Sequence, residues 1–144
     1  MGRIIAIDPG TKRVGIAVTD PTRTIATGLD TIHPNDLVDF LRKYMQAEQV
    51  DSIVVGEPKR LNNEPAQAAK GADELTAKLT KAFPSMHIVR MDERFTSKLA
   101  FNAMLEGGLK KKDRADKALV DKMSATLLLQ SYMEQLNAAK NLTR

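Results

Sequence analysis

Three acidic residues of this chain stand at positions where acids can do chemistry. Asp8 ends a short apolar run, Glu93 follows another, and Asp121 lies near the start of a segment with helical periodicity. Carboxylates that converge repel one another unless protons or cations lie between them, and hard divalent cations such as Mg²⁺ or Mn²⁺ are the usual counter-charge. The three acids therefore predict one metal site if the elements that carry them are neighbours.

Two of these acids share a face with apolar residues. Side chains alternate along a strand, so Asp8 lies on the face of Ile4 and Ala6. Spacing by three and four along a helix puts Asp121 on the same stripe as Leu128. Each acid also has an ordinary explanation, since aspartate opens Asp-Pro-Gly turns and satisfies the first amides of helices.

The third acid has a neighbour that could share its role. Asp92 and Glu93 follow a strand predicted over residues 87–91, and alternation makes Glu93 the inward acid because it continues the face of Met91. Asp92 is a further candidate ligand, and so is Glu57, which follows another apolar run. A structural ion pair for Glu93 and a solvated loop position for Glu57 are the alternatives.

These carboxylates need elements to position them, and the apolar pattern predicts five strands and four helices. The predicted strands cover residues 3–7, 14–19, 24–32, 52–55 and 87–91, and the predicted helices cover about 36–48, 66–82, 97–106 and 118–136. The first two strands form a hairpin, and later strands alternate with helices. That order predicts an α/β fold with a mixed sheet covered by helices, in a single domain over residues 1–144.

Composition excludes several classes of protein. The chain has 144 residues, no cysteine and two histidines, which excludes disulfides, thiolate zinc sites and a cysteine nucleophile. No apolar run approaches the roughly 20 residues that a membrane span needs, so we expect a soluble, cytoplasmic protein without a membrane partner. The net charge of +4 permits a nucleic-acid partner, whereas 4% aromatic residues leave little surface for base stacking.

Basic residues near the acids are candidate contacts to nucleic-acid phosphates, although a lysine run can also be a solvated loop. The predicted nucleic-acid contacts are Lys12, Arg13, Arg94, Lys110, Lys111, Lys112 and Arg114.

Four motifs in order resemble those of the YqgF-type family of Holliday-junction-resolvase-like proteins, which are described as nucleases of precursor 16S ribosomal RNA. The motifs are Ile-Ala-Ile-Asp-Pro-Gly-Thr-Lys-Arg-Val-Gly-Ile-Ala-Val at 5–18, Ile-Val-Val-Gly-Glu-Pro at 53–58, Asp-Glu-Arg-Phe-Thr at 92–96, and Val-Asp-Lys with Ser-Ala at 120–125. Together they span nearly the whole chain. The chain departs from the family at Glu57, where leucine is usual, and at 59–63, which lacks the usual Leu-Asn-Met-Asp-Gly.

The resemblance implies an RNase H-like fold with a mixed five-stranded sheet whose first three strands are antiparallel. It also implies an Mg²⁺- or Mn²⁺-dependent endonuclease with Asp8, Glu93 and Asp121 as catalytic metal ligands. The expected substrate is precursor 16S ribosomal RNA, and the protein is then expected to associate with ribosomal precursors. The alternatives are branched DNA as the substrate, or an RNA-binding module of the same fold without catalysis.

A nucleotide-binding phosphotransferase is a further alternative. The sequence Asp-Pro-Gly-Thr at 8–11 is similar to the first phosphate motif of actin-like ATPases and sugar kinases. Those enzymes bind nucleotide between two related lobes, whereas this chain has residues for one, which favours the nuclease.

Overall fold

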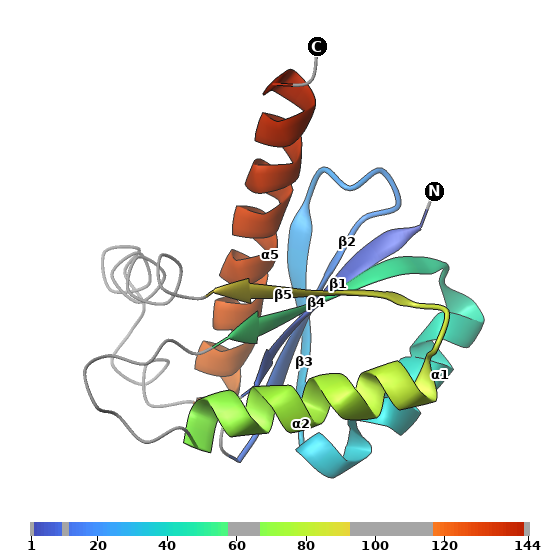
Figure 1. Cartoon of the computed structure of the whole chain (residues 1–144), viewed down its shortest axis with the longest axis vertical. Helices are drawn as coiled ribbons and strands as arrows, with labels where there is room; N and C mark the ends of the chain where they lie inside the picture. The colour runs from blue at the N-terminus through green and yellow to red at the C-terminus, as the bar shows by residue number, and fades with distance from the viewer. Residues whose placement is uncertain (1, 10–11, 58–66, 93–116, 143–144) are drawn as a thin grey trace.

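The computed structural model describes residues 2–9, 12–57, 67–92 and 117–142 of the chain (Figure 1). Its elements are β1 (Arg3–Pro9), β2 (Val14–Thr19), β3 (Ala26–Ile32), a short 3-10 helix η1 (Pro34–Asp36), α1 (Leu37–Ala47), β4 (Val50–Glu57), α2 (Gln67–Ala82), β5 (His87–Asp92) and α5 (Lys117–Leu142). The helix predicted over 97–106 and the basic run after it lie outside the described residues.

The five strands form one mixed sheet in the order β3-β2-β1-β4-β5. β1 pairs antiparallel with β2, and β2 antiparallel with β3. β4 is parallel to β1, and β5 is parallel to β4. The mixed sheet with three antiparallel strands at its start is thus confirmed, and the carboxyl ends of β1, β4 and β5 meet at one edge.

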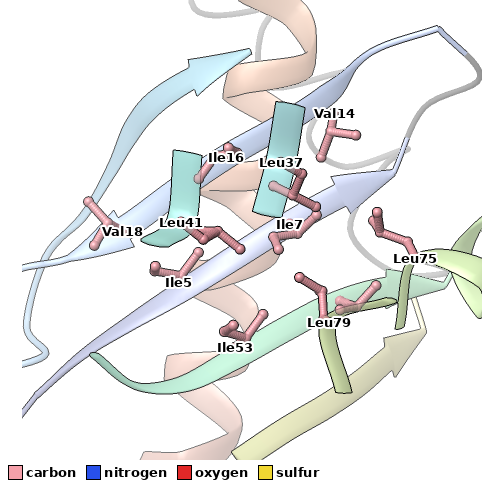
Figure 2. Close-up of a cluster of buried hydrophobic side chains, with 11 residues drawn as sticks. Ile5, Ile7, Val14, Ile16, Val18, Leu37, Leu41, Ile53, Leu75 and Leu79 are labelled. Carbon is pink, nitrogen blue, oxygen red and sulfur yellow. The ribbon is translucent and has the colours of Figure 1, made fainter. Parts of the chain in front are cut away.

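Apolar alternation along the strands builds a separate core on each face of the sheet. On one face, α1 and α2 pack against the sheet through a buried cluster that includes Leu41 of α1 and Leu79 of α2 (Figure 2). In this view α5 lies behind the sheet. On the other face α5 packs its buried Ala125, Leu128 and Tyr132 against the sheet. The residues of β1 divide accordingly, because Ile5 and Ile7 belong to the first cluster while Ile4 and Ala6 belong to the second.

Small residues on the sheet let α5 lie close to it. Ala6 and Ala17 form part of the α5 core cluster. A Cβ atom on Gly28 of β3 would stand only 2.6 Å from Cγ of Lys122, so the alkyl stem of this lysine occupies the space that a side chain at 28 would fill. The last helix therefore packs closely against β3, with side-chain atoms of α5 in the space beside Gly28.

The far end of the sheet, away from the carboxyl ends of β1 and β4, is tied by two aspartates. Asp20 accepts hydrogen bonds from the amides of Thr24 and Ile25, both at 2.7 Å, and closes the turn between β2 and β3. The Thr22 hydroxyl and these amides hold the pKa of Asp20 well below its usual range. Asp51 accepts from the Gly2 amide at 2.8 Å.

Arg23, which has a positive φ of 59°, completes this arrangement. Its guanidinium donates to the Gly2 carbonyl oxygen at 2.8 Å and forms an ion pair with Asp51. The Gly2 amide first, and Arg23 after it, lower the pKa of Asp51.

Several elements differ in length from the sequence prediction. β4 begins at Val50 instead of residue 52, and α5 continues to Leu142 instead of ending near 136. No Gly or Pro follows residue 136 to end the helix, so the backbone continues past the last strongly apolar turn. Within the described ranges, no helix is long and apolar enough to cross a membrane.

Candidate metal and nucleic-acid site

Asp8 lies near the end of β1, the central strand of the sheet. It stands opposite Gly15 of β2 in the antiparallel ladder. Two and four residues earlier on the same face, Ala6 and Ile4 pack in the core beneath α5. Asp8 itself is half-buried. The central strand therefore presents this carboxylate on the α5 face of the sheet, as the alternation predicts.

Asp121 reaches the same place from the first turns of α5. A Cβ atom on Gly15 would overlap the main-chain carbonyl oxygen of Asp121, and the amide nitrogen of Lys122 would be 3.3 Å from it. Since Gly15 is also the ladder partner of Asp8, one glycine contacts the backbones that carry both acids. The Asp121 side chain keeps 31% of its surface exposed. The start of α5 therefore meets β2 beside the ladder partner of Asp8, whereas the convergence of the three carboxylates stays a prediction.

Arg13 faces Asp121 from the position immediately before β2. Its Nε lies 3.7 Å from Oδ2 of Asp121, and the Arg13 side chain is 40% exposed. Sequence reasoning assigned Arg13 to phosphate contact and missed its ion pair with Asp121. The signal that could have found it is its position two residues before Gly15, on the same face of the strand. Lys12, one residue earlier, is exposed.

The third predicted acid cannot be placed, because Glu93 lies outside the described residues. Arg94 and the basic residues Lys110, Lys111, Lys112 and Arg114 are outside them as well. In β5, the strand before Glu93, Val89 and Met91 pack in the core cluster under α5. Alternation along the strand therefore still predicts that Glu93 lies on this face. Asp92 ends β5. The part of the chain that the structure describes holds no group of three or more potential metal ligands.

Glu57 lies on the opposite face of the sheet. It follows Ile53 and Val55, which belong to the α1 and α2 core, at alternating positions of β4. Its carboxylate pairs with Arg90 of β5 at 2.8 Å, and Arg90 also pairs with Asp73 of α2 at 2.9 Å. This network of ion pairs joins β4, β5 and α2. The carboxylate of Glu57 is therefore paired with Arg90, on the face of the sheet opposite to α5.

The donor set on the α5 face fits a hard divalent cation. Asp8 and Asp121 supply carboxylate oxygens, the ligand type that Mg²⁺ and Mn²⁺ prefer, and neither histidine nor cysteine accompanies them in this part of the described chain. These two acids would hold such an ion.

The fold places the chain among proteins related in structure to RuvC, which have the RNase H-like fold. Two solved structures of Thermus thermophilus RuvC, one of them in complex with Holliday junction substrate, resemble it with a TM-score of 0.54 each. The sequence identities are 16% and 14%, and the matches cover 92% and 94% of this chain and 96% of either RuvC chain.

The chain belongs to the RuvX family, described as Holliday junction resolvase, which it matches over residues 2–135. A relative from Christiangramia forsetii is 50% identical over 133 residues, covering 92% of this chain and 98% of the relative. Another from Bacteroides fragilis is 51% identical over 134 residues, covering 93% and 97%. Both relatives bear the name "Putative pre-16S rRNA nuclease". The resemblance seen in the sequence motifs and the expected fold are confirmed.

Proposed function

We propose that this protein is a divalent-metal-dependent endonuclease that hydrolyses phosphodiester bonds in precursor 16S ribosomal RNA. The observation that supports the proposal is the place of Gly15, which is the ladder partner of Asp8 near the end of β1 and contacts the backbone of Asp121. The names of the relatives supply the substrate, and the charge of the chain is compatible with it. With such a substrate, the protein would associate with ribosomal precursors and act in the cytoplasm.

In this proposal the ligands are Asp8, Glu93 and Asp121, with Asp92 as a further candidate. These residues would hold Mg²⁺ or Mn²⁺, which would supply activation of a water molecule and stabilisation of the leaving oxygen. Asp8 is a rigidly held ligand in this proposal, because its strand β1 pairs with a neighbouring strand on each side. Asp121 contributes a carboxylate whose backbone is fixed against Gly15. We leave Glu57 out of the ligand set because Arg90 holds it on the other face.

Basic side chains would bind the substrate without reading its bases. Lys12 and Arg13 stand in the turn that follows Asp8. Arg94 follows the predicted ligand Glu93, and the run from Lys110 to Arg114 precedes α5. Cationic side chains at these positions can contact a phosphate backbone of any sequence.

The test is cleavage of a precursor 16S RNA fragment and of a four-way DNA junction, each with Mg²⁺, Mn²⁺ or chelator. We expect metal-dependent cleavage of the RNA. Asp8→Asn and Asp121→Asn should each lower the rate at least about 100-fold, because each removes a ligand charge without removing volume. Glu57→Gln is the matched control, since it removes a carboxylate from the other face and should cleave like the wild type.

The other outcomes separate the alternatives. Cleavage of the junction alone would make branched DNA the substrate, as the family description favours. Tight RNA binding without cleavage under any metal would indicate a binding module. ATP that raises the melting temperature beyond the effect of Mg²⁺ alone would favour the phosphotransferase.

A further inference from the structure

Arg13 occupies an unexpected place for a residue that contacts nucleic acid, because it already faces a carboxylate of the proposed metal site. Its Nε is 3.7 Å from Oδ2 of Asp121. A divalent cation at Asp121 would compete with the guanidinium for the same carboxylate oxygens, and the two positive charges would repel each other.

The hairpin also brings Arg13 near Asp8. Asp8 is directly opposite Gly15, and Arg13 stands two residues before Gly15, immediately before β2 and the last ladder pair. A single guanidinium is thus close to the elements that carry both acids.

The ion pair is also of a kind that can be exchanged. The side chains of Arg13 and Asp121 are 40% and 31% exposed, so water screens their attraction. A partly exposed pair holds a carboxylate in place but yields to a partner of higher charge.

We infer that Arg13 is a positioning residue that acts as the resident cation of the metal-free site. It holds Asp121 and balances the charge of the acids until a divalent ion takes its place. The released guanidinium then points to the same edge of the sheet and contacts the phosphate backbone of the substrate. This inference rests on the proposed function, because it takes Asp8 and Asp121 as metal ligands.

The first test is calorimetric titration of the whole chain with Mn²⁺. Arg13→Gln should bind Mn²⁺ about 2- to 5-fold more tightly than the wild type, the change that corresponds to losing one competing exposed charge pair. Arg13→Lys keeps the charge and should stay close to the wild type. Lys78→Gln removes an exposed charge from α2 and controls for net charge, so it should leave the Mn²⁺ affinity unchanged. Equal thermal unfolding of the variants would show that all are folded.

The second test measures binding of a nuclease-resistant 2′-O-methyl RNA with Mn²⁺ and with chelator. With Mn²⁺, Arg13→Gln should make the slope of log affinity against log salt shallower by about 0.7, the value for one lost contact to a single strand. With chelator the slopes of the variant and the wild type should agree, because Arg13 is then engaged with Asp121.

Unchanged or weaker Mn²⁺ binding by Arg13→Gln would overturn the exchange, as would an equal loss of RNA contact with and without Mn²⁺. Titrations of Asp8→Asn and Asp121→Asn tell the two proposals apart. Loss of Mn²⁺ binding in both variants supports the metal site whatever Arg13→Gln does. Unchanged binding in both overturns the metal site and the exchange together.

Discussion

Gly15 and Asp121 are in such close contact that a Cβ atom at position 15 would overlap the carbonyl oxygen of Asp121. The overlapping atom belongs to the backbone of a helix, which cannot rotate away as a flexible side chain can. The proposed site therefore depends on a residue that supplies no functional group. Its contribution is the space that lets the first turns of α5 lie on β2.

Gly15→Ala should destabilise the protein by about 1–3 kcal/mol, the usual cost of forcing extra volume into a packed contact. Urea unfolding measures this change. Gly71→Ala is the matched control, because no atom of the described residues lies within 4 Å of a Cβ atom there. Gly71 is within α2, so alanine should stabilise the protein by about 0.8–1 kcal/mol. Equal effects of the two substitutions would contradict the close contact.

Glu57→Gln should leave Mn²⁺ affinity unchanged, because Arg90 holds the Glu57 carboxylate on the face of α1 and α2. The stability cost should stay within about 1 kcal/mol, as for other partly exposed ion pairs. Calorimetry and urea unfolding measure the two effects. Weaker Mn²⁺ binding by this variant would return Glu57 to the ligand set.

Asp51 should make the stability of the protein depend on pH. The Gly2 amide and Arg23 lower its pKa in the folded state, so the unfolded state binds the proton more readily. The stabilisation is complete above the unfolded pKa of about 3.9 and is lost as the pH falls through the lower folded value. Asp51→Asn should therefore show a smaller drop in urea midpoint between pH 7 and pH 3 than the wild type does.

Glu74→Gln is the control for the Asp51 experiment, because it removes an exposed carboxylate from the middle of α2. Its midpoint should fall with pH as the wild-type midpoint does. An Asp51→Asn profile parallel to that of the wild type would show that the Gly2 and Arg23 contacts add nothing to stability.

Replacing Lys110, Lys111 and Lys112 with alanine should weaken RNA binding similarly for all sequences. The slope of log affinity against log salt should become shallower by about 0.7–0.9 for each lost phosphate contact. If these lysines serve only to bind the substrate, the free energy of unfolding should change by less than about 0.5 kcal/mol. An unchanged slope together with unchanged cleavage would mean that the substrate approaches over another face.

The periodicity of apolar residues predicted which residues share a face of a strand or of a helix. Alternation put Asp8 on the face of Ala6, and helical spacing put Asp121 on the face of Leu128, and both faces meet in the α5 core. The sequence pattern could not show whether Glu57 and Asp8 lie on the same face of the sheet. That relationship depends on the register between β4 and β1. The Arg90 partner that settles it is 33 residues away, from 90 − 57.

The contacts of Gly15 and Arg13 with Asp121 were likewise invisible to local patterns. They join residues more than 100 positions apart, since 121 − 15 = 106. A glycine before an apolar pair in a strand usually indicates a bulge or a weak spot, and only a neighbouring backbone shows that close approach is its role.

The position of α5 has a consequence for how the site comes into being. Asp8 and Arg13 are brought together by a hairpin, whereas Asp121 arrives only when the last helix docks on the finished sheet. A chain still in synthesis, or one whose last helix has opened, lacks Asp121, one of the three proposed ligands. Docking of α5 and metal binding are then one coupled equilibrium, so a bound ion should slow amide hydrogen exchange in the first turns of α5.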